Sequence, residues 1–288
     1  MASFFVPPIK IENVDPSTIT LQPTEGKSVY GNLINVRSSG KNLVVILPQM
    51  MCYGAQYSEL SNKETVSTGL SFGSANEDTK NGKRVKVALD KMYEIQRQIE
   101  KLLRDLPSKY FVKNPKCPDE KLSEVDFSAR FTPFIKKSSK TGLCSINVNL
   151  QRIKKDKKKS DEFKHMYGQP LLLKGNKKTG YDKVDIDFTN ASEMLPKMSQ
   201  LNAVIELAYV WCGQAKISCI WHLIHGIIRT EIGGSEFSMA KCIEEDEEEE
   251  EESGSSKKHD LDDKNDDDEQ VSQKRKFDEE DLLLEVEE

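Results

Sequence analysis

The sequence predicts a mainly β (α+β) fold, a barrel or sandwich that carries one inserted amphipathic helix and ends in a disordered acidic tail. Short runs rich in Val, Ile and Leu recur between turn-forming residues, as in a protein built from strands. One segment changes to the period of a helix. The last part, residues 244–288, holds 23 Asp and Glu against 6 Lys and Arg, which is too much charge for a packed core.

The first strands are predicted at 28–37, 42–47 and 65–72, where β-branched and other apolar residues concentrate. Residues 38–41, Ser-Ser-Gly-Lys, separate the first two strands and are typical of a hairpin connection. The stretch 73–82 begins and ends with Gly and contains two Asn, so it is expected to be a loop.

An amphipathic helix is predicted from about Lys86 to Asp105. Its apolar residues recur mostly at spacings of three and four, with Glu, Lys, Arg and Gln between them. Pro107 ends the pattern, because proline cannot continue a helix. The apolar face consists of Met92, Ile95, Ile99, Leu102, Leu103 and Leu106.

Beyond the helix the pattern returns to strands, with one short helix and one basic loop. The clearest strand is 143–151, where alternating apolar and polar residues predict one buried and one solvent-facing side. Residues 152–164 contain seven Lys and Arg and are expected to form the basic loop. The other strands are predicted at 110–113, 125–136, 170–174, 183–188, 203–212 and 216–232, and the short helix at 190–198.

Charge divides the chain into two predicted parts, a β-rich body at 1–243 and the tail at 244–288. The body contains 36 basic and 25 acidic residues and is therefore net basic, although the whole chain carries −6. A basic body attracts polyanions, and an acidic tail in the same molecule can compete with them. A sub-boundary within the body, near residues 75–85, is left open.

Basic residues of the body gather in clusters, and aromatic residues lie close to several of them in sequence. A groove for single-stranded nucleic acid needs this combination, because Lys and Arg follow the phosphates while bases stack on rings. The candidate phosphate contacts are Lys136, Lys137, Lys140, Arg152, Lys154, Lys155, Lys157, Lys158, Lys159, Lys177 and Lys178. The candidate stacking residues are Phe131, Phe134, Tyr167 and Tyr181. The alternative is that the rings belong to the core and the lysines to a solvated surface.

No enzyme, cofactor or metal site is predicted. The motifs GxxxxGK[ST], GxGxxG, HExxH and GxSxG do not occur. Cys212, Cys219, His222 and His225 have a C-x6-C-x2-H-x2-H spacing that is unlike a zinc finger, so core packing is the favoured interpretation. Scattered cysteines, no secretory signal and no apolar run near about 20 residues predict an intracellular protein without a membrane partner.

The order of elements in the second half resembles the single-stranded DNA-binding proteins of nucleocytoplasmic large DNA viruses. The resemblance covers roughly residues 85–235. It rests on Ile146–Leu150, Leu171–Lys178, Val184–Phe188, Asn202–Leu207 and Lys216–Leu223. It implies an OB-fold core and an OB-like barrel. It further implies a role in viral DNA replication, repair or recombination, in the host cytoplasm or nucleus.

The tail is similar to the acidic tails of phage and bacterial single-strand binders. It ends in an apolar tip, Leu282–Leu284 and Val286, embedded in acidic residues. The resemblance implies that such a tail recruits replication proteins and competes with DNA for the groove. The usual aromatic tip is replaced here by leucines, so the same mode of docking does not follow.

The leading functional hypothesis is a non-enzymatic protein that binds single-stranded nucleic acid, DNA rather than RNA. Two other classes stay open from the residues alone. One is a chaperone or assembly factor whose acidic tail binds basic partners, although the basic body speaks against it. The other is a structural virion protein of β-sandwich type. The oligomeric state is not predicted.

Overall fold

A computed structural model describes residues 7–24, 31–60, 63–111, 117–150, 152–155, 158–163, 171–176, 180–187, 189–213 and 215–229. All of them lie in one compact unit, residues 1–248. The predicted tail, 244–288, lies outside the described residues. Among the described helices, none combines the length and the apolar composition needed to span a membrane.

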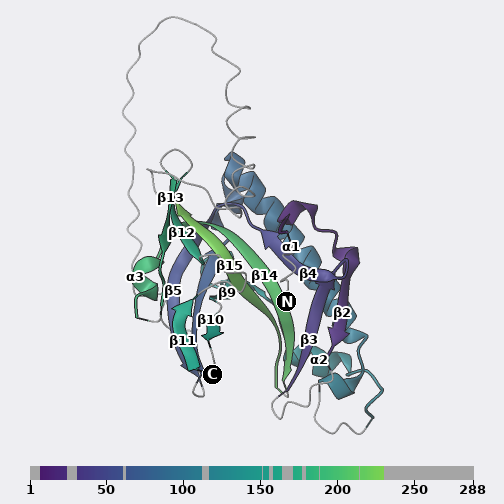
Figure 1. Cartoon of the computed structure of the whole chain (residues 1–288). Helices are drawn as coiled ribbons and strands as arrows, with labels where there is room; N and C mark the ends of the chain where they lie inside the picture. The colour runs from purple at the N-terminus through teal and green to yellow at the C-terminus, as the bar shows by residue number, and fades with distance from the viewer. Residues whose placement is uncertain are drawn as a thin grey trace, which may run out of the picture. The chain divides into compact units, whose positions relative to one another are not determined.

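Five strands close into a barrel (Figure 1). They pair in the circular order β5–β6–β9–β15–β14 and back to β5, and every pair is antiparallel except β9–β15. This closed five-stranded path is an OB-type arrangement, so the prediction of a mainly β, OB-like barrel is confirmed. The strands are β5 (Met50–Leu60), β6 (Lys63–Ser71), β9 (Cys144–Leu150), β14 (Gln200–Gly213) and β15 (Ile217–Arg229).

Alternating residues of these strands fill the inside of the barrel. In β9 the apolar residues Ile146, Val148 and Leu150 are buried, while the residues between them are not. The neighbouring strands β14 and β15 are buried along most of their length, because other elements cover their outer side as well. The inward residues of the other four strands include Cys52, Val66, Leu70, Leu201, Ala203, Ile205, Leu207, Trp221 and Leu223.

Four N-terminal strands extend the sheet along the outer edge of β14. They are β1 (Ile9–Lys10), β2 (Ile19–Pro23), β3 (Gly31–Ser38) and β4 (Lys41–Ile46). β3 and β4 form the predicted hairpin, with Ser39 and Gly40 at φ values of 49° and 77° in the two-residue turn. Positive φ at both positions is what a turn matched to the twist of the strands requires. Two 3-10 helices, η1 (Ile11–Asn13) and η2 (Pro16–Thr18), precede β2.

The helix α1 (Lys80–Arg104) is inserted between β6 and β9, which confirms the predicted helix. It starts about two turns earlier than expected, because the Thr79 side chain accepts a hydrogen bond from the Gly82 backbone N–H at 2.9 Å. A Cβ at Gly82 would lie 2.3 Å from the Glu77 carbonyl oxygen, so only glycine fits there. The buried face consists of Val85, Ala88, Met92, Ile95, Ile99 and Leu103, and it packs against η1, η2, β2 and β8.

Short strands between β9 and β15 complete the barrel wall, since these two strands pair over only two residues. β7 (Phe131–Thr132) pairs with β15, and β8 (Ile135–Lys137) pairs with β9. The hairpin β12 (Leu172–Asn176) and β13 (Gly180–Val184) joins the other end of β15. A separate ribbon is formed by β10 (Arg152–Lys155) and β11 (Lys158–Phe163). The remaining short helices are η3 (Gly73–Asn76), η4 (Ser108–Tyr110) and α3 (Ala191–Met194).

Three local predictions are wrong. Residues 124–130 form the helix α2 (Glu124–Arg130) instead of a strand, because Ser123 caps it and Phe127 alone supplies the buried contact. The expected strand at 110–113 begins in η4, and residues 112–116 lie outside the described part. The expected basic loop holds the β10–β11 ribbon.

β5 was not predicted at all. A β-bulge between Cys52 and Ala55 breaks its alternation, and Gly54 sits in the bulge at a φ of 82°. An extra residue of this kind shifts the apolar positions from one parity to the other. The strand therefore carries no regular pattern in sequence.

The buried face of α1 predicts a stability effect. Replacing Ile95 by Ala should lower the free energy of unfolding by about 2–5 kcal/mol, because Ile95 is fully buried in the main core. The matched control is Val87→Ala on the same helix, where the side chain is exposed and the change should stay within about 0.5 kcal/mol. Urea denaturation of both variants measures the difference. Equal losses would contradict the assigned helix face.

Candidate nucleic-acid interface

The outer face of β6 and β9 is polar, and it is open along β9, while η3 covers the end of β6 at Ser71. Where Ile146 and Val148 point into the barrel, their neighbours Ser145, Asn147 and Asn149 point outward. On β6 the opposite positions are Ser71, Gly69 and Ser67. This surface, the β6–β9 face, presents the hydroxyls of Ser67 and Ser145 and the amides of Asn147 and Asn149, which can donate and accept hydrogen bonds, while Ser71 is buried.

An aromatic ring lies on the β6–β9 face. A Cβ built on Gly69 would come within 2.6 Å of Cδ2 of Tyr53 and 3.3 Å of Oδ1 of Asn147. The ring of Tyr53 therefore rests directly on the glycine backbone of the neighbouring strand, and Tyr53 is half-buried. This contact restrains the Tyr53 side chain, so little side-chain entropy would be lost if its ring bound a ligand.

Lysines flank one end of this face. Lys136 on β8 lies opposite Ser145 on β9, and Ser145 lies opposite Ser71 on β6. Lys136 and Lys137 are exposed, and Lys140 is exposed in the turn that follows β8. The structure thus places the first predicted group of phosphate contacts beside the start of β9.

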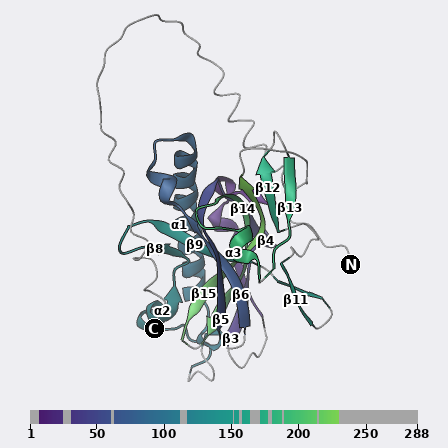
Figure 2. The same cartoon turned by 90° about the vertical axis from the view of Figure 1, so that its left-hand side faces the viewer.

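The β10–β11 ribbon follows the other end of β9. Its register sets Lys154 opposite Lys159 and Lys155 opposite Lys158, so two successive residue pairs of the ribbon join lysine to lysine. Figure 2 shows β8 and α1 on one side of β5 and β6, and the β10–β11 ribbon on the other. Arg152 lies at the base of the ribbon, opposite Phe163.

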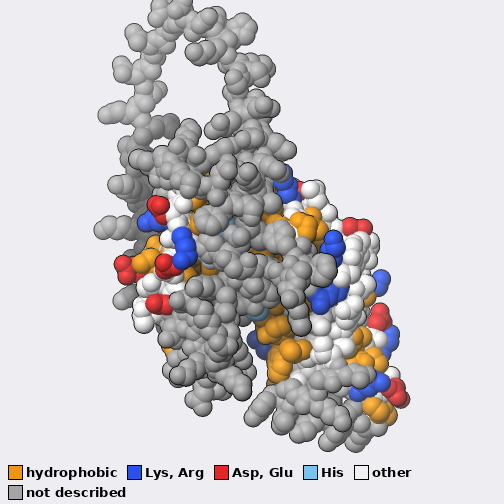
Figure 3. All heavy atoms as spheres, in the orientation of Figure 1, with side chains coloured by type: hydrophobic (Ala, Val, Ile, Leu, Met, Phe, Trp, Pro, Cys, Tyr) orange, Lys and Arg blue, Asp and Glu red, His pale blue; other side chains and the backbone are white. Residues whose placement is uncertain are grey.

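The distance between the two basic groups suits an extended ligand. β9 spans seven residues, from Cys144 to Leu150, which corresponds to about 23 Å at 3.3 Å per residue. A strand of this length with cations at both ends and hydrogen-bonding groups between them is a linear track. The charges on the face seen in Figure 1 do not form such a track. There, Lys and Arg side chains lie among Asp and Glu side chains (Figure 3).

The predicted stacking residues lie elsewhere. Phe134 is buried against Trp221, with ring centroids 5.4 Å apart, where β7 and β8 bridge β9 and β15. Tyr181 is buried in a second cluster under the β12–β13 hairpin, with Leu173, Val204 and Ile224. Phe131 is half-buried and stacks on Phe127 at 5.5 Å. For these three rings the structure favours the core interpretation that the sequence left open.

Four predicted site residues, Lys157, Lys177, Lys178 and Tyr167, lie outside the described residues and stay predictions. Tyr53 was missed, because it belongs to the unpredicted strand β5. The available signal was Gly54 within a stretch of apolar and aromatic residues, since a glycine inside a strand often marks a bulge.

A polar pair lies on the outer side of the sheet beyond Asn149, where Glu206 is buried and His222 is half-buried. His222 on β15 is opposite both Asn149 and Glu206, and the Asn42 amide donates a hydrogen bond to the Glu206 carboxylate. Burial lowers the pKa of His222. Burial also raises the pKa of Glu206, against the opposing effects of Asn42 and Arg37. Both shifts favour the neutral forms, so the cations of this region come from the flanking lysines.

In the ranges that the structure describes, no three His, Cys, Asp or Glu side chains gather closely enough to hold a metal ion. Cys212 and Cys219, which the sequence analysis considered as metal ligands, have free thiols on β14 and β15. Burial raises the pKa of Cys212 to about 12. The Cys212 thiol is buried in the main core, where it packs as a small apolar group.

No protein-family model matches the chain, and no curated protein matches its sequence. Among solved structures, it is similar to the single-stranded DNA-binding protein of bacteriophage Enc34 in complex with ssDNA, at 14% identity and a TM-score of 0.35. That match covers 75% of this chain and 99% of the phage chain. The same phage protein without the ssDNA complex gives 15% identity, a TM-score of 0.34, and coverage of 76% and 94%. Similarity at these values does not establish what this chain binds.

The contact between Tyr53 and Gly69 predicts a coupled stability effect. Gly69→Ala should destabilise the protein by about 1–3 kcal/mol, because the new methyl group collides with the ring. In a Tyr53→Ala background the same change should be neutral or stabilising, since alanine then only restricts the unfolded chain. A double-mutant cycle by urea denaturation measures the coupling. Additive effects would show that the ring does not rest on Gly69.

Proposed function

We propose that this protein binds single-stranded DNA along the β6–β9 face and has no catalytic role. The observation that carries the proposal is the polar track of β9, with lysines beside its start and a lysine-paired ribbon at its end. The face between strands 2 and 3 is also where OB-type barrels bind oligonucleotides. β6 and β9 are the second and third strands of this barrel along the chain.

Each part of the track has a physical task. The ammonium groups of Lys136 and Lys137 and the lysines of β10 and β11 contact phosphates and displace counterions. The ring of Tyr53 stacks on a base, an interaction worth about 1–3 kcal/mol. Asn147 and Asn149 donate and accept hydrogen bonds at base edges.

A single strand fits this surface better than a duplex. Stacking on Tyr53 requires an exposed base face, which a duplex does not offer away from its ends. The ring also lies on a sheet, with Asn147 beside it, rather than on a protruding helix that could enter a major groove. DNA as the preferred strand is part of the proposal, and binding of RNA of the same length is its direct comparison.

Removing the lysines of β8 tests the track. Lys136→Ala with Lys137→Ala should weaken binding to oligo-dT and reduce the slope of log K against log salt by roughly 0.7 for each phosphate that is no longer neutralised. The control is Lys101→Ala, an exposed lysine in the last turn of α1 that is not on the β6–β9 face, which should leave the slope unchanged. Fluorescence anisotropy across a salt series provides the slopes.

Two results would overturn the proposal. One is a slope near zero for the unmodified protein, which would mean that phosphates are not bound. The other is an equal loss of slope in the Lys101→Ala control, which would mean that the cations act only through overall charge. Duplex DNA bound as tightly as single strands would contradict the preference for single strands.

We further propose that the acidic tail regulates this surface and recruits replication proteins to it. The tail has a net charge of −17 from 23 acidic and 6 basic residues, against a basic body. It also ends in the apolar tip at Leu282–Leu284 and Val286, which is suited to docking in a partner. The cellular role is then DNA replication, repair or recombination, inside the cell, and for a large DNA virus in the host cytoplasm or nucleus.

Truncation after Ile243 tests the regulatory part. Binding to oligo-dT should tighten at low salt, because a competing polyanion has been removed. The gain should shrink as salt rises, since screening weakens the competition in the full-length protein. Anisotropy titrations of both forms measure it. Unchanged affinity at low salt would reject competition by the tail and leave recruitment as its role.

A further inference from the structure

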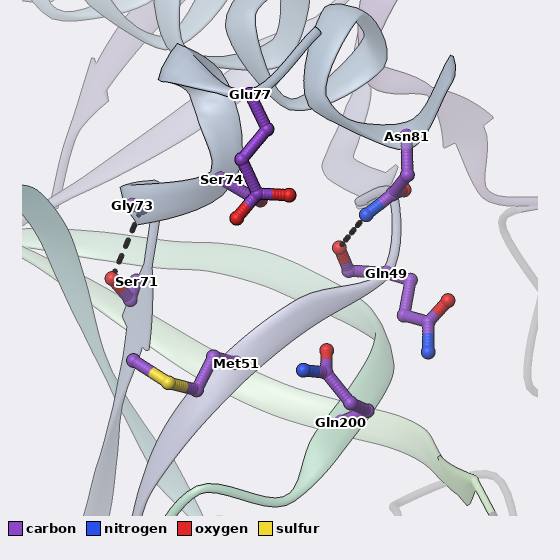
Figure 4. A pocket seen from close by; sticks show the side chains of 8 residues that line it. All are labelled: Gln49, Met51, Ser71, Gly73, Ser74, Glu77, Asn81 and Gln200. Atoms are coloured by element: carbon purple, nitrogen blue, oxygen red, sulfur yellow. Dashed lines mark hydrogen bonds between the residues drawn. The ribbon is translucent and has the colours of Figure 1, made fainter. Parts of the chain in front are cut away.

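A polar pocket of ≈ 430 Å³ lies beside the β6–β9 face. Its floor is the outer surface of β5, β6 and β14, and its roof is η3 and the first turn of α1 (Figure 4). Glu77 reaches in from the helical side, while Gln200 and Met51 reach in from the strands (Figure 4). The complete lining is Gln49, Met51, Ser71, Gly73, Ser74, Glu77, Asn81 and Gln200.

Strand register connects this pocket to the proposed DNA track. One row of paired residues crosses five neighbouring strands, from the lysine of β8 to the pocket floor. The inward neighbours on four of these strands, Cys52, Leu70, Ile146 and Leu201, are buried in the core, so the row runs along the outer face. Its members are, in order, Lys136, Ser145, Ser71, Met51 and Gln200.

The lining chemistry suits a neutral polar group better than a phosphate. The eight lining residues include no Lys or Arg, and the carboxylate of Glu77 repels an anion. The Asn81 amide is oriented by donating to the Gln49 carbonyl oxygen at 2.9 Å, and the Ser71 hydroxyl accepts from the Gly73 backbone N–H at 3.1 Å. Met51 adds an apolar wall against which a flat ring can pack.

We propose that this pocket takes one nucleobase of the bound strand and prefers a base with an exocyclic amino group. Carboxylates accept hydrogen bonds from the amino group of cytosine, and amides such as those of Gln49 and Gln200 pair with base edges by donating and accepting together. Thymine and uracil present a carbonyl oxygen at the position of the cytosine amine, which faces the Glu77 carboxylate unfavourably. This inference rests on the proposed binding of single-stranded DNA.

The test compares oligo-dC, oligo-dT and oligo-dU of equal length with the full chain at neutral pH and fixed salt. Oligo-dC and oligo-dU differ at the pyrimidine ring edge and not in charge, so their affinity ratio reports base reading alone. The unmodified protein should favour oligo-dC by about fivefold or more over both others. Glu77→Gln and Gln200→Ala should each reduce this ratio toward one.

Two control variants separate base reading from electrostatics. Asp90→Asn removes the same charge from an exposed position of α1 and should leave the ratio unchanged. Lys136→Ala with Lys137→Ala should weaken all three oligonucleotides by the same factor. Equal affinities of the unmodified protein for oligo-dC and oligo-dU would overturn the base pocket and leave DNA binding intact. Failure to bind any oligonucleotide would overturn both proposals.

Discussion

The structure depends on how β14 divides its backbone hydrogen bonds. One edge of this strand pairs with β15, while the other edge meets β5, β4 and β3 in turn. Only Gln200 and Leu201 pair with β5. The backbone N–H groups of Cys52 and Ala55 continue the contact by donating to the carbonyl oxygens of Ser199 and Leu195. The barrel is therefore closed at one end of β14, and the rest of the strand carries the added sheet. Bulges in its pairing with β15 supply the local twist that this change of partner needs.

The outer surface of a closed barrel must be either covered by other elements or polar. In this protein one half of that surface is covered and the other half is polar. Over β4, β14 and β15, apolar residues such as Val44 and Val204 face outward and are covered by the β12–β13 hairpin. Over β9 the outward residues Ser145, Asn147 and Asn149 are polar and partly or fully exposed, so the sheet stays open there. The open half is where the sheet can meet a ligand, so burial of the other half leaves the proposed DNA track on β9 and not elsewhere on the barrel.

Elements with an uninterrupted period could be predicted from sequence, and those without one could not. Met92, Ile95 and Ile99 repeat at helical spacing and predicted α1, and the alternation in β9 predicted both its strand and its polar face. Gly54 interrupts the alternation of β5, so neither the strand nor the position of Tyr53 on it could be predicted. Phe134 and Tyr181 lie near lysines in sequence, yet which side of a strand a ring occupies depends on pairing partners far along the chain. The pocket joins residues from 49 to 200, and no local pattern brings them together.

The short contact that closes the barrel has a further consequence. Met51 and Gln200 form one of its two residue pairs, and both side chains also line the pocket. A ligand in the pocket therefore contacts both strands of the pair that closes the barrel and stabilises their pairing. Binding and local opening are then thermodynamically linked, because a ligand held by both strands is released when the strands part. Protection of the β5 and β14 backbone amides from hydrogen exchange should therefore report whether the pocket is occupied.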